Sequence, residues 1–287
     1  MCAQTLGPRV PYPESMRAWC NGALVDPTSP VLSVLDHGVT VGDGVFEVLK
    51  VIDNAPFALT RHLRRLTRSA RGLGLPEPDQ GLVRQAVKAT LAAEDVARGL
   101  VRITYTAGIS PLSSERATES PTLVVVSKTQ DARPRRTAVI TVPWTRNERG
   151  TLVGLKTTSY GENVRALAYA AERDATEGIF ANTVGMLCEG TGSNVFCVFD
   201  GVVVTPPLSS GCLAGITREL VIEWYDVHER DISMAELDDA DELFLTSTTR
   251  DVQVIKRLNG RSRGKEQPVT KAVASEWSRR EAQDVDP

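Results

Sequence analysis

The sequence has little from which a metal centre, a disulfide framework or a membrane span could be built. Only three histidines occur in 287 residues, and they are too widely spaced to suggest metal ligands, so we expect no zinc site. The five cysteines are odd in number, scattered and without a CxxC pair, which is typical of reduced thiols in a cytoplasmic protein. The proline-containing first residues lack a long apolar run, so they predict neither a signal peptide nor a membrane span.

The chain also lacks a strongly positive net charge. The formal net charge is −3, which argues against nucleic acid as the main partner but leaves room for a local basic pocket. The hydrophobic content of 41% and charged content of 24% are ordinary for a globular protein. The length is enough for a large core in one domain or two.

The first part of the chain predicts strands interleaved with two helices. Asn21-Gly22 predicts a two-residue hairpin turn. Apolar residues spaced 4-3-4-3 from residue 59 to residue 73 predict an amphipathic helix over residues 61–71, which carries five arginines. Such a run is usually a solvated face, although one guanidinium could turn inward to bind a phosphate. The other expected elements are strands at 16–20, 24–25, 31–34, 41–51, 56–59, 100–106 and 122–126, and a helix after Pro78.

A polar, proline-containing stretch at residues 129–136 interrupts two strand signals. We therefore expect it to link a small N-terminal α/β domain, residues 1–128, to a larger C-terminal domain, residues 137–287. The first 15 residues are expected to form a loose arm, and residues 281–287 a frayed end. The elements expected in the second domain are strands at 137–142, 179–182, 186–189, 194–199, 202–205, 241–247 and 252–255, and helices at 162–175, 216–227 and 268–280.

Lys156 is the centre of the candidate site. A short apolar run at residues 152–155 precedes it and a helical pattern follows, so we expect Lys156 where a strand ends and a helix begins. Half-burial there would lower the pKa of its amine and keep it nucleophilic, as Schiff-base chemistry requires. A solvated turn lysine is the commoner reading of these residues alone. The apolar face of the following helix is expected to contain Val164, Leu167, Ala168 and Ala171.

Three later segments raise the significance of Lys156. Glu189 is expected at a strand end, beside small residues that allow a planar ring to approach. Residues 213–217 open a helix, whose free N–H groups and dipole favour a phosphate dianion. Residues 244–249 end a strand in four hydroxyl side chains. Each segment alone fits an ordinary turn, helix start or sheet edge, but together they supply an amine, a partner for a pyridinium and a phosphate cup.

With these motifs the sequence resembles the fold-type IV pyridoxal-phosphate enzymes, the class IV aminotransferase family, from about residue 16 to the closing helix. The resemblance implies an α/β fold of the α+β type, with two domains around pyridoxal 5′-phosphate, similar to D-amino-acid aminotransferase. It also implies a homodimer in which the partner subunit often completes the substrate pocket. The stretches that carry the resemblance are Gly42-Asp-Gly-Val-Phe-Glu47, His62-Leu-Arg-Arg-Leu66, the Lys156 segment, Glu189-Gly-Thr-Gly-Ser-Asn194, residues 213–217 and residues 240–248.

The resemblance also implies roles for individual residues. Lys156 would anchor the cofactor covalently and Glu189 would bond the pyridine nitrogen. Arg65 matches the phosphate-binding arginine, because it precedes Leu66 and stands three residues after His62. The further implied cofactor contacts are Leu213 on the ring and Ile216, Thr217 and Thr248 at the phosphate, and the candidate substrate-binding residues are Arg102 and Thr249.

The resemblance leaves the activity open among members of the family. Branched-chain enzymes usually have a tyrosine where this chain has Val41 and an arginine where it has Lys50. D-amino-acid transaminases match better, but their Arg-x-His carboxylate trap is replaced by Leu112-Ser-Ser114. By elimination we expect a 4-amino-4-deoxychorismate lyase, which makes 4-aminobenzoate and pyruvate for folate synthesis. The alternatives are a transaminase of D-amino acids or other amino acids, and a non-catalytic protein that only binds the cofactor.

Overall fold

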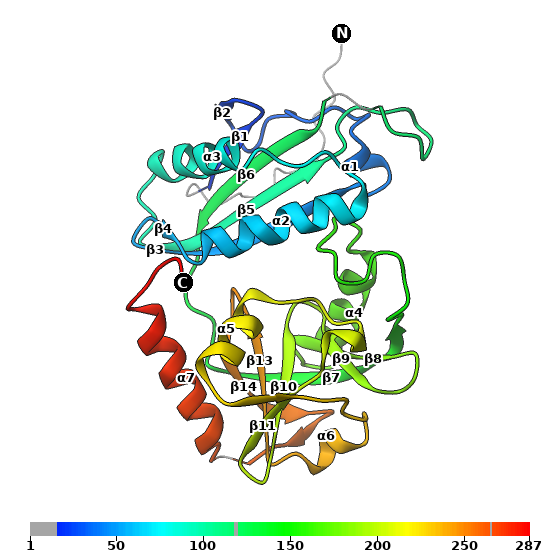
Figure 1. Cartoon of the computed structure of the whole chain (residues 1–287), viewed down its shortest axis with the longest axis vertical. Helices are drawn as coiled ribbons and strands as arrows, with labels where there is room; N and C mark the ends of the chain where they lie inside the picture. The colour runs from blue at the N-terminus through cyan, green and yellow to red at the C-terminus, as the bar shows by residue number, and fades with distance from the viewer. Residues whose placement is uncertain (1–15, 118–119, 265) are drawn as a thin grey trace.

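The computed structural model describes residues 16–117, 120–264 and 266–287. The arm expected at residues 1–15 lies outside this part of the chain. Two β-sheets with flanking helices lie one above the other (Figure 1). Residues 130–135 connect the last strand of the first sheet to the first strand of the second. The division into two domains at residues 129–136 stays a prediction.

The first sheet is antiparallel throughout and is covered on one face by α2 and α3 (Figure 1). Apolar side chains of both helices pack on its central strands and form one core cluster. The described strands have the order β2-β1-β6-β5-β3-β4. The elements are β1 Met16–Cys20, β2 Ala23–Val25, α1 His37–Thr40, β3 Gly44–Ile52, β4 Ala55–Pro56, α2 Leu59–Leu73, α3 Gln80–Ala92, β5 Arg98–Thr106 and β6 Thr122–Thr129.

Local sequence explains the two best-defined features of this half. The predicted Asn21-Gly22 turn joins β1 to β2, and both residues have positive φ, as a tight hairpin turn requires. The predicted helix is α2, which buries Leu63, Leu66 and Ala70 at spacings of three and four residues. It ends at Gly74, whose left-handed backbone returns its N–H to the last turn. Both predictions are confirmed.

The second sheet mixes parallel and antiparallel pairs and has helices on both faces. Its described strands have the order β12-β11-β10-β13-β14-β7-β8-β9, with β15 paired to β14. One apolar cluster contains residues of α5 and α7, and another contains residues around α6. The elements are β7 Arg136–Arg146, α4 Gly161–Ala171, β8 Glu177–Asn182, β9 Leu187–Gly190, β10 Asn194–Phe199, β11 Val202–Thr205, η1 Leu208–Ser210, α5 Ile216–Trp224, β12 Val227–Glu229, α6 Glu236–Asp239, β13 Glu242–Ser247, β14 Asp251–Leu258, β15 Arg261–Ser262 and α7 Pro268–Glu281.

The C-terminal residues tie the two halves together, so the expected fraying of residues 281–287 is wrong. The Ala58 N–H donates to Val285 O at 2.7 Å, and the Thr60 N–H donates to the Asp286 carboxylate at 2.8 Å. The buried amine of Lys50 on β3 pairs with carboxylates from β14 and α7. These contacts fix the position of the first sheet above the second.

Three further predictions of local structure are wrong. Residues 31–34 form an irregular loop rather than a strand, and their apolar side chains are exposed instead of packing on a sheet. Residues 152–154 also form turns, so a loop rather than a strand precedes Lys156. The helix α4 buries Asn163, Ala166 and Ala170, whereas Val164 is 65% exposed. The buried face of α4 is therefore the one with small and polar residues, because it packs closely on β7 and β8.

Several expected boundaries also shift. The helix expected over residues 162–175 ends at Ala171. The strand expected at residues 56–59 is limited to Ala55–Pro56, because α2 already begins at Leu59. The helix expected over residues 216–227 ends at Trp224, and Val227 begins β12.

Candidate active site

A cavity of about 770 Å³ lies between the first sheet and the second. All nine candidate residues predicted from the sequence line it, and they come from both halves of the chain. The first half contributes α2 and the strands β3 and β5, and the second half contributes the loops around β9, α5 and β13. The nine residues are Arg65, Arg102, Lys156, Glu189, Leu213, Ile216, Thr217, Thr248 and Thr249.

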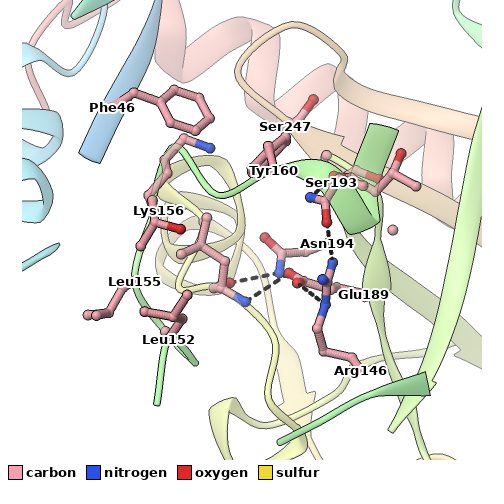
Figure 2. Close-up of a pocket in the computed structure, with 18 of the residues that line it drawn as sticks. Phe46, Arg146, Leu152, Leu155, Lys156, Tyr160, Glu189, Ser193, Asn194 and Ser247 are labelled. Carbon is pink, nitrogen blue, oxygen red and sulfur yellow. Dashed lines mark hydrogen bonds and ion pairs between the residues drawn. The ribbon is translucent and has the colours of Figure 1, made fainter. Parts of the chain in front are cut away.

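Lys156 is held by its backbone and has a free side-chain amine. Its N–H donates to Ser69 Oγ at 3.1 Å, and its carbonyl accepts from Phe46 N at 2.9 Å. Its Nζ lies 4.3 Å from the Phe46 ring centroid and 5.7 Å from that of Tyr160 (Figure 2). Within the described residues, no hydrogen bond occupies this amine. Burial, followed by the nearby positive charge of Arg65, lowers the pKa of Lys156 to about 8.

Arg65 points inward from α2 and is fixed by a buried carboxylate. Its Nε and Nη2 donate to the two oxygens of Glu47 at 2.7 and 2.6 Å, and Nη1 donates to Ala214 O at 2.9 Å. His62 Nδ1 lies 2.7 Å from the same carboxylate. Burial alone would raise the pKa of Glu47, but the charge and hydrogen bonds of Arg65 lower it to about 2. A rigid guanidinium beside α5 follows from this arrangement.

The start of α5 is an open anion site on the same cavity. Gly215 is its N-cap and provides no side chain to satisfy the first N–H groups. A Cβ at this position would overlap Asn194 Oδ1. The Asn194 side chain is buried and its Nδ2 donates to Leu213 O at 2.9 Å, so a residue larger than glycine would have to displace it. Ile216 and Thr217 follow, both buried, and Thr248 lies on the same cavity wall. The helix dipole and free N–H groups favour a phosphate here.

Glu189 lies in another part of the cavity wall, in an ion pair. Its Oε2 accepts from Leu213 N at 2.8 Å, and its Oε1 lies 3.4 Å from Arg146 Nε (Figure 2). Burial raises the pKa of Glu189, and the charge of Arg146 opposes this rise. The Arg146 guanidinium also donates to Asn163 Oδ1 at 2.8 Å, and it lies 4.3 Å above the Phe180 ring. Glu189 is thus a fixed carboxylate that can face a cationic ring nitrogen.

Arg102 brings a further cation to the cavity from β5. Its guanidinium carbon lies 3.9 Å from the Phe46 ring centroid, and its Nε donates to Thr104 Oγ1 at 3.2 Å. In the described parts of the chain, no acidic side chain pairs with it. Burial lowers the pKa of Arg102, as expected for a cation without a counter-charge. The candidate Thr249 also lines the cavity.

Sequence reasoning missed several residues of the site. Arg146 lies far from Glu189 in sequence and gave no signal of its own, and Tyr160 looked like an ordinary residue before a helix. Phe46 and Glu47 stood within a quoted motif but had no assigned role. The alternation of β3 could have separated them, because Phe46 faces Lys156 whereas Glu47 faces α2.

The cavity fits the expected cofactor. Ser193 and Thr246 line it, and their hydroxyl oxygens are buried with no hydrogen-bond partner among the described residues. Buried polar atoms of this kind call for a bound group or water. The Lys156 amine, which has no hydrogen-bond partner among the described residues, matches the aldehyde of the cofactor. The uncapped start of α5 beside Arg65 matches its phosphate, and the buried carboxylate of Glu189 matches its ring nitrogen. In the described residues, no cluster of three or more His, Cys, Asp or Glu could hold a metal, and no helix is long and apolar enough to cross a membrane.

Comparisons with known proteins agree with this chemistry. The family described as amino-transferase class IV matches residues 44–258. A putative branched-chain-amino-acid aminotransferase of Methanocaldococcus jannaschii is 31% identical over 86% of this chain and 89% of its own length. A bifunctional aminodeoxychorismate lyase / D-amino acid transaminase of Mycobacterium tuberculosis is 30% identical over 84% and 90%. The PLP-bound form of a hypothetical aminotransferase from M. tuberculosis has a TM-score of 0.82 and 29% identity, covering 91% of this chain and 97% of that one.

Proposed function

The chain belongs to the class IV aminotransferase family and uses pyridoxal 5′-phosphate, and we propose that it is principally a 4-amino-4-deoxychorismate lyase. In this reaction the substrate gives 4-aminobenzoate and pyruvate, and no second substrate is consumed. A transamination of D-amino acids at the same site is the second candidate. It is supported by the relative from M. tuberculosis, whose name includes both a lyase and a D-amino acid transaminase activity.

The residues that would hold the cofactor are those of the cavity wall. We propose Lys156 as its covalent anchor and Glu189 as the carboxylate that keeps its ring nitrogen protonated. The start of α5 would bind the phosphate, through Ile216 and Thr217, with Arg65 and Thr248 beside it. The remaining assignment is Leu213 against the ring, supported by its place on the wall next to Glu189.

The bound cofactor supplies an electron sink that accepts charge from the reacting carbon. Lys156 Nζ, with a pKa lowered to about 8, can accept and return a proton near neutral pH. The amine can therefore remove a proton from the substrate ring and deliver one to the departing pyruvate unit. The hydrogen bonds of the Lys156 backbone to Ser69 and Phe46 fix the point from which its side chain reaches into the cavity.

One observation favours the lyase over the transaminase. Residues 111–114, which follow Ser110, include no basic residue that could bind a substrate carboxylate. The backbone carbonyls of Pro111 and Ser113 accept from His37 Nε2 at 3.0 and 3.1 Å. Arg102 is thus the candidate carboxylate partner on this side of the cavity. A small amino acid depends on its carboxylate for binding, whereas a ring substrate also gains from burial of its apolar surface. The cavity of about 770 Å³ has space for a ring substrate beside the cofactor.

The two activities can be separated by their products. The cofactor-loaded enzyme would be incubated with aminodeoxychorismate alone, and separately with D-alanine plus 2-oxoglutarate. We expect release of 4-aminobenzoate without a 2-oxo acid, with the Lys156→Ala variant as the control for spontaneous breakdown. D-glutamate formation without 4-aminobenzoate release would overturn the lyase assignment and leave the transaminase.

We also propose a homodimer in the cytoplasm. Exposed apolar side chains support self-association, among them Val34, Leu112 and Val184, which are 81%, 78% and 67% exposed. The described cysteines are all free thiols, as in a reducing compartment. Light scattering of the purified enzyme measures the first point, and a mass near the 31.1 kDa of one chain would contradict it.

A further inference from the structure

A second cavity, of about 510 Å³, lies beside the connection between the two sheets. Its walls come from the connecting residues 133–134, the strands β7 and β14, and the turn at residues 174–176. None of its lining residues lines the cavity that contains Lys156. Five of the residues that line it are basic: Arg133, Arg136, Arg250, Lys256 and Arg257.

This concentration of positive charge runs against the composition of the chain, whose formal net charge is −3. Asp174 is the acidic residue among those that line the cavity. Glu177 does not line it but forms an ion pair with Arg250, which does. The basic side chains therefore exceed these acidic ones by three. An excess of this size in a concave site attracts anions.

The fold holds several of these cations in place. Arg250 has only 6% of its side chain exposed, lies 2.9 Å from Glu177 Oε2, and donates to Thr176 O at 2.8 Å. Arg257 donates to Asp174 O. A bulge in the pairing of β14 with β7 falls between Ile255 and Arg257, and bulges redirect side chains. Lys256 and Arg257, adjacent in sequence, both line the cavity as a result.

We propose that this cavity binds a small molecule with two or more phosphate groups. Guanidinium groups match phosphate oxygens with paired donors, and four of the five basic residues are arginines. The cavity volume suits a metabolite rather than a polymer. Residues of the exposed rim, Arg133 and Lys256, supply charge that no acidic side chain of the described structure neutralises, and they can turn toward a ligand.

The site is connected to the active site through two residues. Arg250 directly follows Thr249, which lines the active-site cavity. Its partner Glu177 accepts hydrogen bonds from Thr191 Oγ1 and Gly192 N, and both residues also line that cavity. An anion that draws Arg250 toward itself weakens its pair with Glu177. Phosphate binding in the second cavity therefore changes the affinity for pyridoxal phosphate in the first, and the reverse holds equally.

Calorimetric titration of the cofactor-loaded protein with pyrophosphate tests the site, because the bound cofactor already occupies the phosphate cup at α5. A chloride salt is added so that the ionic strength stays constant during the titration. We expect saturable binding to the wild type and at least tenfold weaker binding to the double variant Arg133→Ser, Lys256→Ser. The matched control removes two exposed cations elsewhere, Arg64→Ser and Lys88→Ser, and should bind like the wild type.

Absence of pyrophosphate binding to the wild type would overturn the proposal. Equally weakened binding in both double variants would also overturn it, because the attraction would then depend on overall charge and not on this cavity. Thermal melting of all three proteins verifies that they are folded alike. A repeat with ATP separates a nucleotide ligand, which binds more tightly than pyrophosphate, from a free oligophosphate, which does not.

The connection has its own readout in the affinity of the cofactor-free protein for pyridoxal phosphate. Pyrophosphate should shift this affinity more in the wild type than in the Arg133→Ser, Lys256→Ser variant, because only competition at the phosphate cup remains in the variant. Equal shifts in the two proteins would overturn the connection.

Discussion

Replacing Glu47 by glutamine removes the charge that holds Arg65 in the cavity wall. Glu47 is completely buried and accepts from Arg65 Nε and Nη2 and from His62. The lowering of its pKa from 4.5 to about 2 corresponds to about 3 kcal/mol, at roughly 1.4 kcal/mol per unit. Removing one member of a buried ion pair costs roughly 3–5 kcal/mol in other proteins. We therefore expect Glu47→Gln to lower the free energy of unfolding by about 3 kcal/mol at pH 7.

Urea unfolding of the wild type and the variant measures this difference, and thermal melting should show a loss of roughly 6–12 °C. The matched control is Glu77→Gln. Arg71 on the same helix pairs with Glu77 at 2.6 Å, but both side chains are more than half exposed. An exposed pair contributes at most about 1 kcal/mol. Equal losses in the two variants would refute the reasoning, because burial would then have no part in the effect.

The difference in unfolding free energy between the wild type and Glu47→Gln should also depend on pH. The folded protein holds the pKa of Glu47 below its ordinary value of 4.5, so its stabilising contribution is complete above that pH. It is lost as the pH falls toward 2, where the folded protein also binds the proton. The gap between wild type and Glu47→Gln should therefore narrow from pH 5 downward, and a constant gap would contradict the assignment.

Three further predictions concern the cavity. The rate at which the cofactor-free protein captures pyridoxal phosphate should rise with pH up to about 8 and then level off, following the lowered pKa of Lys156; a continued rise to pH 10 would show an ordinary lysine. Arg102→Met should raise the KM for a carboxylate substrate roughly 10- to 100-fold with little change in cofactor affinity, and an unchanged KM would remove Arg102 from the substrate site. Gly215→Ala should destabilise the protein by about 1–3 kcal/mol, because its Cβ would overlap Asn194. The control Gly192→Ala should leave stability unchanged, because nothing lies within 4 Å of the new Cβ. Equal melting temperatures of the two variants would count against the close packing at α5.

The sequence was most informative where a local rule determines structure. The spacing of apolar residues predicted α2. The choice of Arg65 among its five arginines came instead from the resemblance to the family, in which its place beside Leu66 and His62 matches the phosphate-binding arginine. The hairpin at Asn21-Gly22 followed from backbone conformation alone. The helix and the hairpin depend on neighbours in sequence, so one sequence suffices to find them.

Features that depend on distant segments could not be predicted in this way. Val164 lies on an apolar stripe of α4, yet it is exposed, because β7 and β8 leave space only for the small side chains of Ala166 and Ala170. Arg146 joins Glu189 across 43 residues, and nothing in its local sequence indicates that contact. The C-terminal residues looked frayed because their partners lie on α2 and just before it.

The most direct test of the account is to identify the amine that binds the cofactor. Borohydride reduction of the loaded enzyme, followed by peptide mapping, should place the reduced cofactor on Lys156. Lys50 is the internal comparison, because it is more deeply buried but its amine is held by Asp251 and Glu281. Label on Lys156, and its loss in Lys156→Ala with the fold retained, is the result that we predict. Label on Lys50 or another lysine, or label that persists in the variant, would contradict the central claim.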